Sequence, residues 1–188
     1  PAPILHHADV RRSLTTMRAR VAAARSICYA CAVAADLAEA SPDEDVRAAA
    51  KLREDLLTPI AKAWSTDMGV EVASLGVQVH GGMGFMDETL AAQLYRDSRI
   101  APIYEGTNGI QAIDLVGRKL SGTNGESMRV MLGEVEATAA AARATNDPQL
   151  VQIADRLRAG ADALREASDW MLGQMKGREQ DKALAGAT

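Results

Sequence analysis

The sequence is poor in aromatic residues, which make up 3% of its 188 positions. Its charges nearly balance, with 21 lysine and arginine residues against 25 aspartate and glutamate residues and a net charge of −4. A surface that binds nucleic acid combines a basic stripe with aromatic side chains that stack on bases. The sequence contains no such stripe, and it therefore argues against nucleic acid as a partner.

Cysteine and histidine are also scarce, with two and three residues respectively. Cys28 and Cys31 have the C-x-x-C spacing of redox and zinc motifs. Both fall one turn apart in a strongly helical segment, however, and no second Cys/His pair follows. We therefore expect two small buried core residues. His6 and His7 precede the first expected helix and His80 stands alone, so we expect no metal site.

Long apolar runs are absent as well. No uninterrupted apolar segment reaches the roughly 18 residues of a membrane span, and no signal-peptide pattern opens the sequence. These absences predict a cytoplasmic protein without a membrane span.

Alanine, by contrast, is abundant and β-branched residues are sparse, which favours an all-α fold. The first helix is expected over about residues 9–40, with Asp9 as its N-cap. Three residues predict the start of the second helix: Ser41 caps it, Pro42 takes the first helical position and Glu44 completes a capping box.

The second helix is expected to continue to Val79, with a kink or a break at Thr58-Pro59. Further helices are expected over about residues 89–99, 107–120, 126–144 and 148–175, the last capped by Asp147. Residues 121–125 predict a flexible linker, and the polar tail after Gly177 is expected to be frayed. The sequence therefore predicts an antiparallel four-helix bundle in a domain of residues 1–121. A C-terminal helical extension over residues 122–188 would begin a second domain.

By residue type and position alone, Glu105 is the strongest candidate for a catalytic residue. It lies in a loop between two expected helices and is followed by Gly106, which leaves room for a ligand to approach the backbone. The alternative is a solvated glutamate that interacts with the dipole of the next helix. Judged from residue type and position alone, the solvated glutamate is favoured.

A second candidate site is the sequence Gln78-Val79-His80-Gly81-Gly82 at the end of the second helix. Its glycines permit close approach of the backbone to an anion such as a pyrophosphate. A glycine-rich turn is more often only a helix stop, so this motif is weak by itself.

Together, Gln78-Val79-His80-Gly81-Gly82 and Tyr104-Glu105-Gly106-Thr107 resemble the flavin- and substrate-binding region of the acyl-CoA dehydrogenases. The resemblance implies that Glu105 is the base that removes the α-proton of an acyl-CoA, with Tyr104 and Gly106 beside the substrate. It also implies contacts to FAD from the helix-end motif and from Thr107, Asn108 and Gln111. The closest likeness is to larger bacterial members similar to 3-methylmercaptopropionyl-CoA dehydrogenase, which carry an additional C-terminal helical domain.

The resemblance further implies partners that the sequence itself does not contain. These are the family's N-terminal helical and middle β-domains, a second copy in a homodimer or homotetramer, and electron-transfer flavoprotein or a similar acceptor. We expect this chain alone to be an incomplete enzyme that retains FAD poorly. Two alternatives remain, namely a catalytically silent oligomerisation module derived from the family and an unrelated helical protein that binds a partner.

Overall fold

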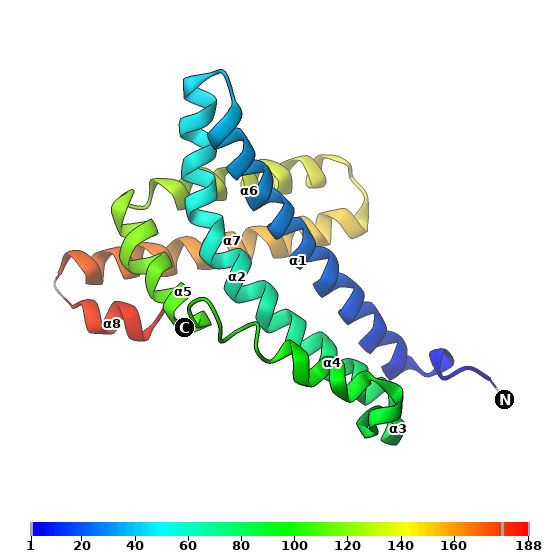
Figure 1. The fold of residues 1–188 in the computed structure, drawn as a ribbon. Helices are drawn as coiled ribbons and strands as arrows, with labels where there is room; N and C mark the ends of the chain where they lie inside the picture. Colours follow the sequence, from blue (N-terminus) through cyan, green and yellow to red (C-terminus); the bar gives the residue numbers. More distant parts are fainter. Residues whose placement is uncertain (1, 178, 188) are drawn as a thin grey trace.

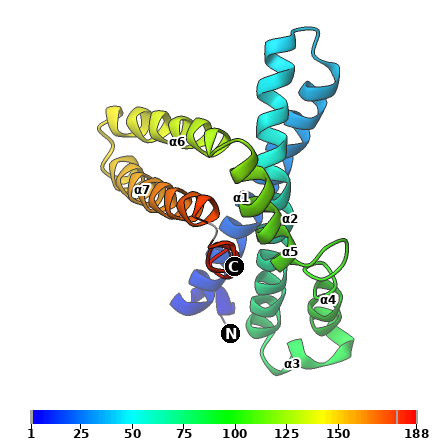
Figure 2. The same cartoon turned by 90° about the vertical axis from the view of Figure 1, so that its left-hand side faces the viewer.

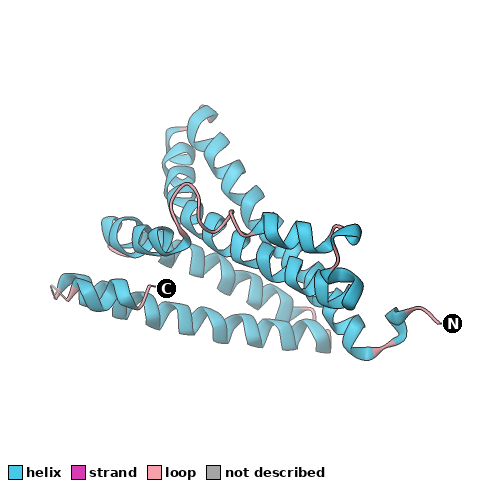
Figure 3. Ribbon diagram, turned by 60° about the horizontal axis from the view of Figure 1, so that its bottom comes forward, coloured by secondary structure: helices cyan, strands magenta, loops and turns pink. Residues whose placement is uncertain are grey.

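A computed structural model describes residues 2–177 and 179–187, and every regular element in these residues is helical (Figure 3). The α-helices are α1 (Ala8–Ala40), α2 (Glu44–His80), α3 (Gly82–Phe85), α4 (Ala91–Ser98), α5 (Asn108–Asp114), α6 (Glu126–Ala144), α7 (Pro148–Lys176) and α8 (Gln180–Ala185). Two short 3-10 helices, η1 (Ile4–His6) and η2 (Asp87–Thr89), and one π-helical segment, η3 (Leu115–Leu120), complete the set. The all-α prediction is confirmed.

Helix α2 is the central element of the fold. It runs antiparallel to α1, and α4 and α5 pack on it as well (Figure 1). Helices α6 and α7 form a second antiparallel hairpin, which lies on the side of α2 opposite to α4 (Figure 2). The loop between α4 and α5 therefore crosses the surface of a long helix that is held from several sides.

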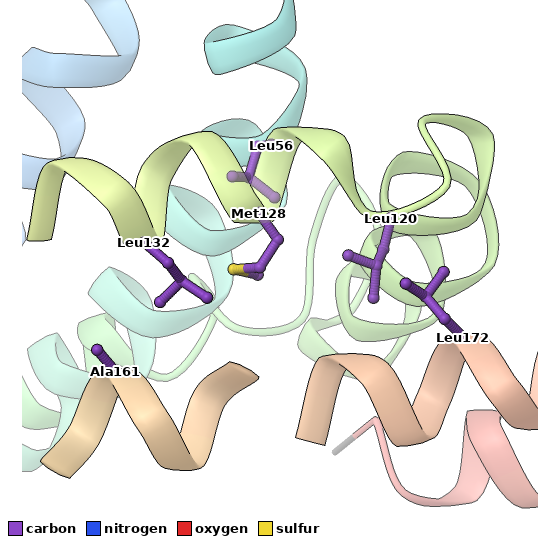
Figure 4. Packing of buried hydrophobic residues seen from close by; sticks show 6 residues of the cluster. All are labelled: Leu56, Leu120, Met128, Leu132, Ala161 and Leu172. Atoms are coloured by element: carbon purple, nitrogen blue, oxygen red, sulfur yellow. The ribbon is translucent and has the colours of Figure 1, made fainter. Parts of the chain in front are cut away.

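The main hydrophobic core joins the two hairpins. It gathers one side chain from α2, one from η3, two from α6 and two from α7 (Figure 4): Leu56, Leu120, Met128, Leu132, Ala161 and Leu172. Beside it, Lys119 Nζ lies 2.7 Å from Asp55 Oδ1 and ties η3 to α2. Burial would raise the pKa of the Asp55 carboxyl, but hydrogen bonds from Lys119 and Lys51 outweigh it and hold that pKa below its ordinary value.

The structure confirms one of the three predicted helix N-caps and contradicts the other two. Asp147 caps α7 as predicted, because its Oδ1 accepts from the N–H groups of Gln149 and Leu150. The prediction that Ser41 caps α2 is wrong, because Ser41 still closes α1. Asp43 takes the role instead, accepting hydrogen bonds from the second and third residues of α2. Asp9 lies in the first turn of α1 and His7 occupies the N-cap position, so that prediction is wrong too.

The interior of α2 shows the kink and not the break of the two expected at Thr58-Pro59, whereas the segment after η3 differs from expectation. Helix α2 continues through Pro59, which is buried, and its axis changes direction near its middle (Figure 1). Residues 121–122 are still helical and residues 123–125 form a turn, and the Gly125 N–H donates to the Leu120 carbonyl at 2.9 Å. Gly125 has a φ of 78°, a backbone conformation that favours glycine. The segment is therefore a hydrogen-bonded turn, whereas the domain boundary placed there stays a prediction.

The polar tail after Gly177 is not frayed over its described part, so that prediction is wrong for residues 179–187. It forms α8, and Ala183 in this helix is fully buried. The physical reason is the pair Ala183-Leu184, which packs α8 against α7 and η3. Residues 178 and 188 lie outside the described part.

The two cysteines face α2, but neither is fully buried. Cys28 is exposed and Cys31 is half-buried, and each thiol lies against a hydroxyl of α2, Ser65 and Thr58 respectively. The prediction of two buried core residues is therefore wrong, clearly for Cys28 and in degree for Cys31. It failed because α1 has few large neighbours in this structure, with Ala34 as its buried residue.

Helix α1 exposes much of its apolar surface, including Tyr29, Val33 and Leu37. By length and composition, α1 is also the one described helix that could cross a membrane, which differs from the prediction that no segment could. The indication is weak, because a helix packed in a protein core has the same composition. An exposed apolar surface of this kind is typical of a face that contacts another protein surface.

Candidate functional site

The loop that carries Glu105 is built by local hydrogen bonds. The N–H groups of Ile103 and Tyr104 both donate to the Ile100 carbonyl, and the Asn108 N–H donates to the carbonyl of the buried Pro102. These bonds fold the chain back toward α2 before α5 begins.

Glu105 itself adopts a left-handed backbone conformation with a φ of 52°, and Gly106 follows with a φ of 87°. Such a conformation costs a residue other than glycine about 1–3 kcal/mol and tends to occur at functional sites. Glycine is favoured at position 106 by this conformation, whereas a Cβ there would lie 3.1 Å from the Gln111 amide nitrogen and would require only a small shift of that side chain. The strain at Glu105 therefore needs compensating contacts.

Two side chains attach the loop to α2. Lys62 Nζ donates to the Gly106 carbonyl at 2.7 Å and to Asn108 Oδ1 at 2.9 Å. Both Lys62 and Asn108 are half-buried. The loop is thus tied to the central helix on the C-terminal side of Glu105.

The Asn108 side chain uses its hydrogen-bonding capacity within the chain. Its Nδ2 donates to the Ala63 carbonyl at 3.0 Å and to Asp67 Oδ1 at 2.8 Å, while its Oδ1 accepts from Lys62 and from the Thr66 hydroxyl. The amide is therefore oriented with its oxygen toward the ammonium of Lys62 and its nitrogen toward the carboxylate of Asp67. A contact from this side chain to FAD stays a prediction, and it would compete with these bonds.

Thr107 and Gln111 have mainly local roles in this structure. Thr107 is the N-cap of α5, because its Oγ1 accepts from the Ile110 N–H at 3.3 Å. Gln111 Nε2 donates to the Glu105 carbonyl at 3.5 Å, a weak bond by its length. The Thr107 hydroxyl keeps a free donor for an external group.

The surroundings of the Glu105 carboxylate are open and apolar. Glu105 is exposed, and its side chain makes no hydrogen bond or ion pair with the described part of the chain. Ile103 and Tyr104 directly precede it along the loop and Ile110 follows in α5, and each of these three side chains is more than half exposed. A carboxylate that is positioned by its backbone and flanked by exposed apolar side chains can act on a partly apolar ligand.

The helix-end motif has a different construction. Helix α2 ends at His80, and Gly81 has a φ of 62° that favours glycine. His80 Nδ1 lies 2.8 Å from the Gly76 carbonyl, while Gln78 and Val79 near the helix end are each at least partly accessible. Gly82 is exposed and has no positive φ, and a Cβ added to it would meet nothing within 4 Å. Neither backbone conformation nor internal packing requires glycine at this position, which is consistent with space kept for an external group.

Gly84 and Gly82 form a matched pair for a test of this difference. A Cβ on the buried Gly84 would lie 2.3 Å from the Val77 carbonyl oxygen, so Gly84→Ala should destabilise the chain by about 1–3 kcal/mol through overpacking. Gly82→Ala should leave the thermal midpoint almost unchanged, because the added Cβ meets nothing within 4 Å. Thermal unfolding followed by circular dichroism checks both expectations. Equal midpoints for the two variants would contradict the packing argument.

The structure brings the loop residues together but keeps the helix-end motif apart from them. Asn108 contacts Asp67 in α2, and Gly81 follows fourteen residues later at the end of the same helix. At 1.5 Å per residue, this separation is about 20 Å. One small group cannot contact both motifs of one chain, although a long ligand or two subunits could use both.

Sequence reasoning missed Lys62, Thr66 and Asp67, which hold the loop from α2. The available signal was a cluster of polar residues at helical spacing in the mostly apolar part of α2 after Asp55. Such a pattern usually marks the solvent-exposed face of a helix. Only the structure shows that these side chains form hydrogen bonds with Asn108.

Residues 2–121 match the family model described as acyl-CoA dehydrogenase, C-terminal domain. The 3-methylmercaptopropionyl-CoA dehydrogenase of Ruegeria pomeroyi is 43% identical over 98% of this chain and 31% of its own length. Butyryl-CoA dehydrogenase of Syntrophomonas wolfei is 36% identical over 70% of this chain and 22% of its own length. The broad-specificity linear acyl-CoA dehydrogenase FadE5 of Mycobacterium tuberculosis is 33% identical over 71% of this chain and 22% of its own length.

The chain thus spans less than a third of the length of these relatives. The family model covers both motifs, and the match to the Ruegeria pomeroyi protein extends beyond it into α6 and α7. The predicted likeness to that group is therefore confirmed. By the extent of the family match, this chain belongs to the acyl-CoA dehydrogenase family.

Proposed function

We propose that this chain is the C-terminal part of a flavin-dependent acyl-CoA dehydrogenase and that Glu105 is its catalytic base. The observation that carries the proposal is the exposed Glu105 carboxylate on a loop that α2 holds in place. The exposed side chains of Ile103, Tyr104 and Ile110 would lie beside the acyl chain, and the carboxylate would meet the carbon next to the thioester.

The reaction balances as a removal of two hydrogen atoms. The Glu105 carboxylate takes the α-proton of the acyl-CoA, and the electron pair of that C–H bond forms the Cα=Cβ double bond. The hydrogen on the β-carbon leaves with its bonding pair as hydride. When bound, FAD supplies the acceptor for this hydride. The product is a trans-unsaturated acyl-CoA, and the proton stays on Glu105 until it exchanges with water.

The residues at the end of α2 fit part of a flavin site. His80 and Gly82 are exposed, and a group that approaches Gly82 meets no side chain there. Because this turn lies about 20 Å from the Glu105 loop, it would hold a distant part of the FAD or the FAD of a second subunit. Thr107 and Gln111 would contribute from the loop side.

The proposal includes partners for the exposed apolar surface. Tyr29, Val33 and Leu37 of α1 line a groove of about 600 Å³ together with side chains of α2 and α6. We assign this kind of surface to contacts with other parts of a longer protein and with a second copy of it. Electron-transfer flavoprotein or a similar acceptor would reoxidise the flavin, and a cytoplasmic location stays a prediction.

The test uses the full-length protein that carries this chain. We expect it to purify with FAD and the flavin absorbance to bleach under anaerobic conditions when saturated acyl-CoA thioesters are added. A panel that includes methylthio-substituted and linear acyl groups would identify the preferred substrate. A protein that binds no FAD, or whose flavin is not bleached by any thioester, would contradict the proposal. That outcome would favour the silent oligomerisation module, for which the exposed surface of α1 is the supporting observation.

A further inference from the structure

Lys62 has surroundings that an ordinary surface lysine does not have. It is half-buried, and two of its three N–H donors are engaged, on the Gly106 carbonyl and on Asn108 Oδ1. Within residues 2–177 and 179–187, no carboxylate oxygen lies within 4 Å of its ammonium. The charge is thus directed at the backbone and at the amide side chain of the loop that carries Glu105.

The helix that presents Lys62 is held firmly at this point. Leu56, Leu57 and Pro59, which precede Lys62 by one to two turns, are buried. Leu56 belongs to the core that joins α2 with α6 and α7. The position of the ammonium is therefore fixed by the interior of the protein and not by the loop.

The loop needs such a fixed point because its backbone is strained. Glu105 and Gly106 are consecutive left-handed residues, and the other contact to their carbonyls is the weak bond from Gln111 at 3.5 Å. The bond from Lys62 fixes the peptide plane between Gly106 and Thr107, directly after the strained pair. Loss of this bond would allow Glu105 to relax to the ordinary right-handed or extended conformations and its carboxylate to change direction.

Other contacts of the network explain helix packing but not this orientation. Asn108 attaches the start of α5 to Ala63 and Asp67 even without Lys62. Helix α5 would therefore remain docked in a Lys62 variant, and the change would be confined to the residues before it. A change limited to the residues before α5 would show that Lys62 positions the loop and does not stabilise the fold as a whole.

We propose that Lys62 is a positioning residue that holds Glu105 in its left-handed conformation and thereby aims the carboxylate at the substrate. This inference rests on the proposed function of Glu105. The bond involved is a charge-assisted hydrogen bond, which is stronger than a bond between neutral groups. The part of Lys62 that matters is thus its ability to donate to the Gly106 carbonyl.

The test compares three variants of the full-length protein: Lys62→Met, Lys62→Arg and Lys51→Met. Methionine keeps the aliphatic stem and removes the donor, whereas arginine retains donors. Lys51 lies on the same helix but pairs with Glu54 and Asp55, so its variant controls for loss of a lysine from α2. Flavin reduction at saturating acyl-CoA, the dissociation constant of a non-reducing acyl-CoA thioether, and hydrogen exchange of a peptide over residues 103–108 are measured for each variant.

For Lys62→Met we expect flavin reduction to slow by about 10²-fold, since a misplacement of about 1 Å has this effect on a catalytic group. Binding of the thioether should be unchanged, and exchange over residues 103–108 should become faster. Lys62→Arg should recover most of the rate, and Lys51→Met should behave as wild type.

Several outcomes would overturn the inference. The inference fails if Lys62→Met reduces its flavin at the wild-type rate. It also fails if this variant loses rate and thioether binding in parallel, or if its melting temperature falls without faster hydrogen exchange over residues 103–108. If Lys62→Arg recovers none of the rate, loss of the hydrogen bond does not explain the slow reduction in Lys62→Met. If Glu105→Gln is fully active, the proposed function fails instead, and hydrogen exchange still decides whether Lys62 holds the loop.

Discussion

Replacing Glu105 with glutamine is expected to slow flavin reduction by an acyl-CoA by about 10² to 10⁴-fold, the usual contribution of a general base. Glutamine keeps the size of the side chain and accepts hydrogen bonds, but it cannot take the α-proton. It can also occupy the same left-handed backbone conformation, so the loop and its bonds to Lys62 should persist. Anaerobic stopped-flow bleaching with the best thioester of the panel measures the effect.

The nearest acids along the chain are not placed to substitute for Glu105. Asp97 accepts from Gln93 within α4, and Asp114 pairs with Arg118 at 2.6 Å. Asp97→Asn is therefore the matched control, because it removes one carboxylate from the adjoining helix without changing the loop. Bleaching of the Glu105→Gln flavin at the wild-type rate would show that another residue is the base, and loss of flavin from this variant would show a role in binding instead.

Truncating Leu56 to alanine is expected to lower the free energy of unfolding by about 2–5 kcal/mol, the usual range for a buried leucine. Leu56 is 1% exposed and belongs to the core shared by α2, η3, α6 and α7. The cavity left by its side chain cannot close easily, because four elements would have to move together. Urea unfolding followed by circular dichroism, with the slope compared between variants, measures the loss.

Leu94→Ala is the control for this truncation, because Leu94 is 66% exposed on α4. A surface truncation of this kind should change the free energy of unfolding by no more than about 0.5 kcal/mol. A loss of less than about 1 kcal/mol for Leu56→Ala would mean that the two hairpins are not joined through this core.

The features that could be predicted from the sequence depend on residues close to one another along the chain. The helix start at Asp147 follows from a side chain that bonds the N–H groups two and three residues ahead. Even this local logic failed at α2, where Ser41 was the predicted cap and Asp43, two residues later, is the cap in the structure. The structure selects Asp43 because Ser41 is still engaged at the end of α1.

The features that could not be predicted depend on contacts between distant parts of the chain. Asn108 binds α2 more than forty residues earlier, and nothing in its own neighbourhood distinguishes it from a ligand contact. The left-handed conformation of Glu105 likewise follows from the tie to Lys62, since glutamate has no intrinsic preference for it. The order of α8 depends on Ala183 meeting a surface of α7 and η3 that the sequence does not reveal.

The uninterrupted course of α2 between Asp67 and Gly81 restricts how homologous sequences can differ in length. One inserted residue there would rotate everything after it by about 100° and move it by about 1.5 Å along the helix axis. Insertions and deletions should therefore be absent between these positions and collect at residues 41–43 and 145–147, where the hairpins turn at the surface. The length of α2 therefore sets the distance between the two motifs, and a change in this length would alter that distance even if every residue in both motifs were retained.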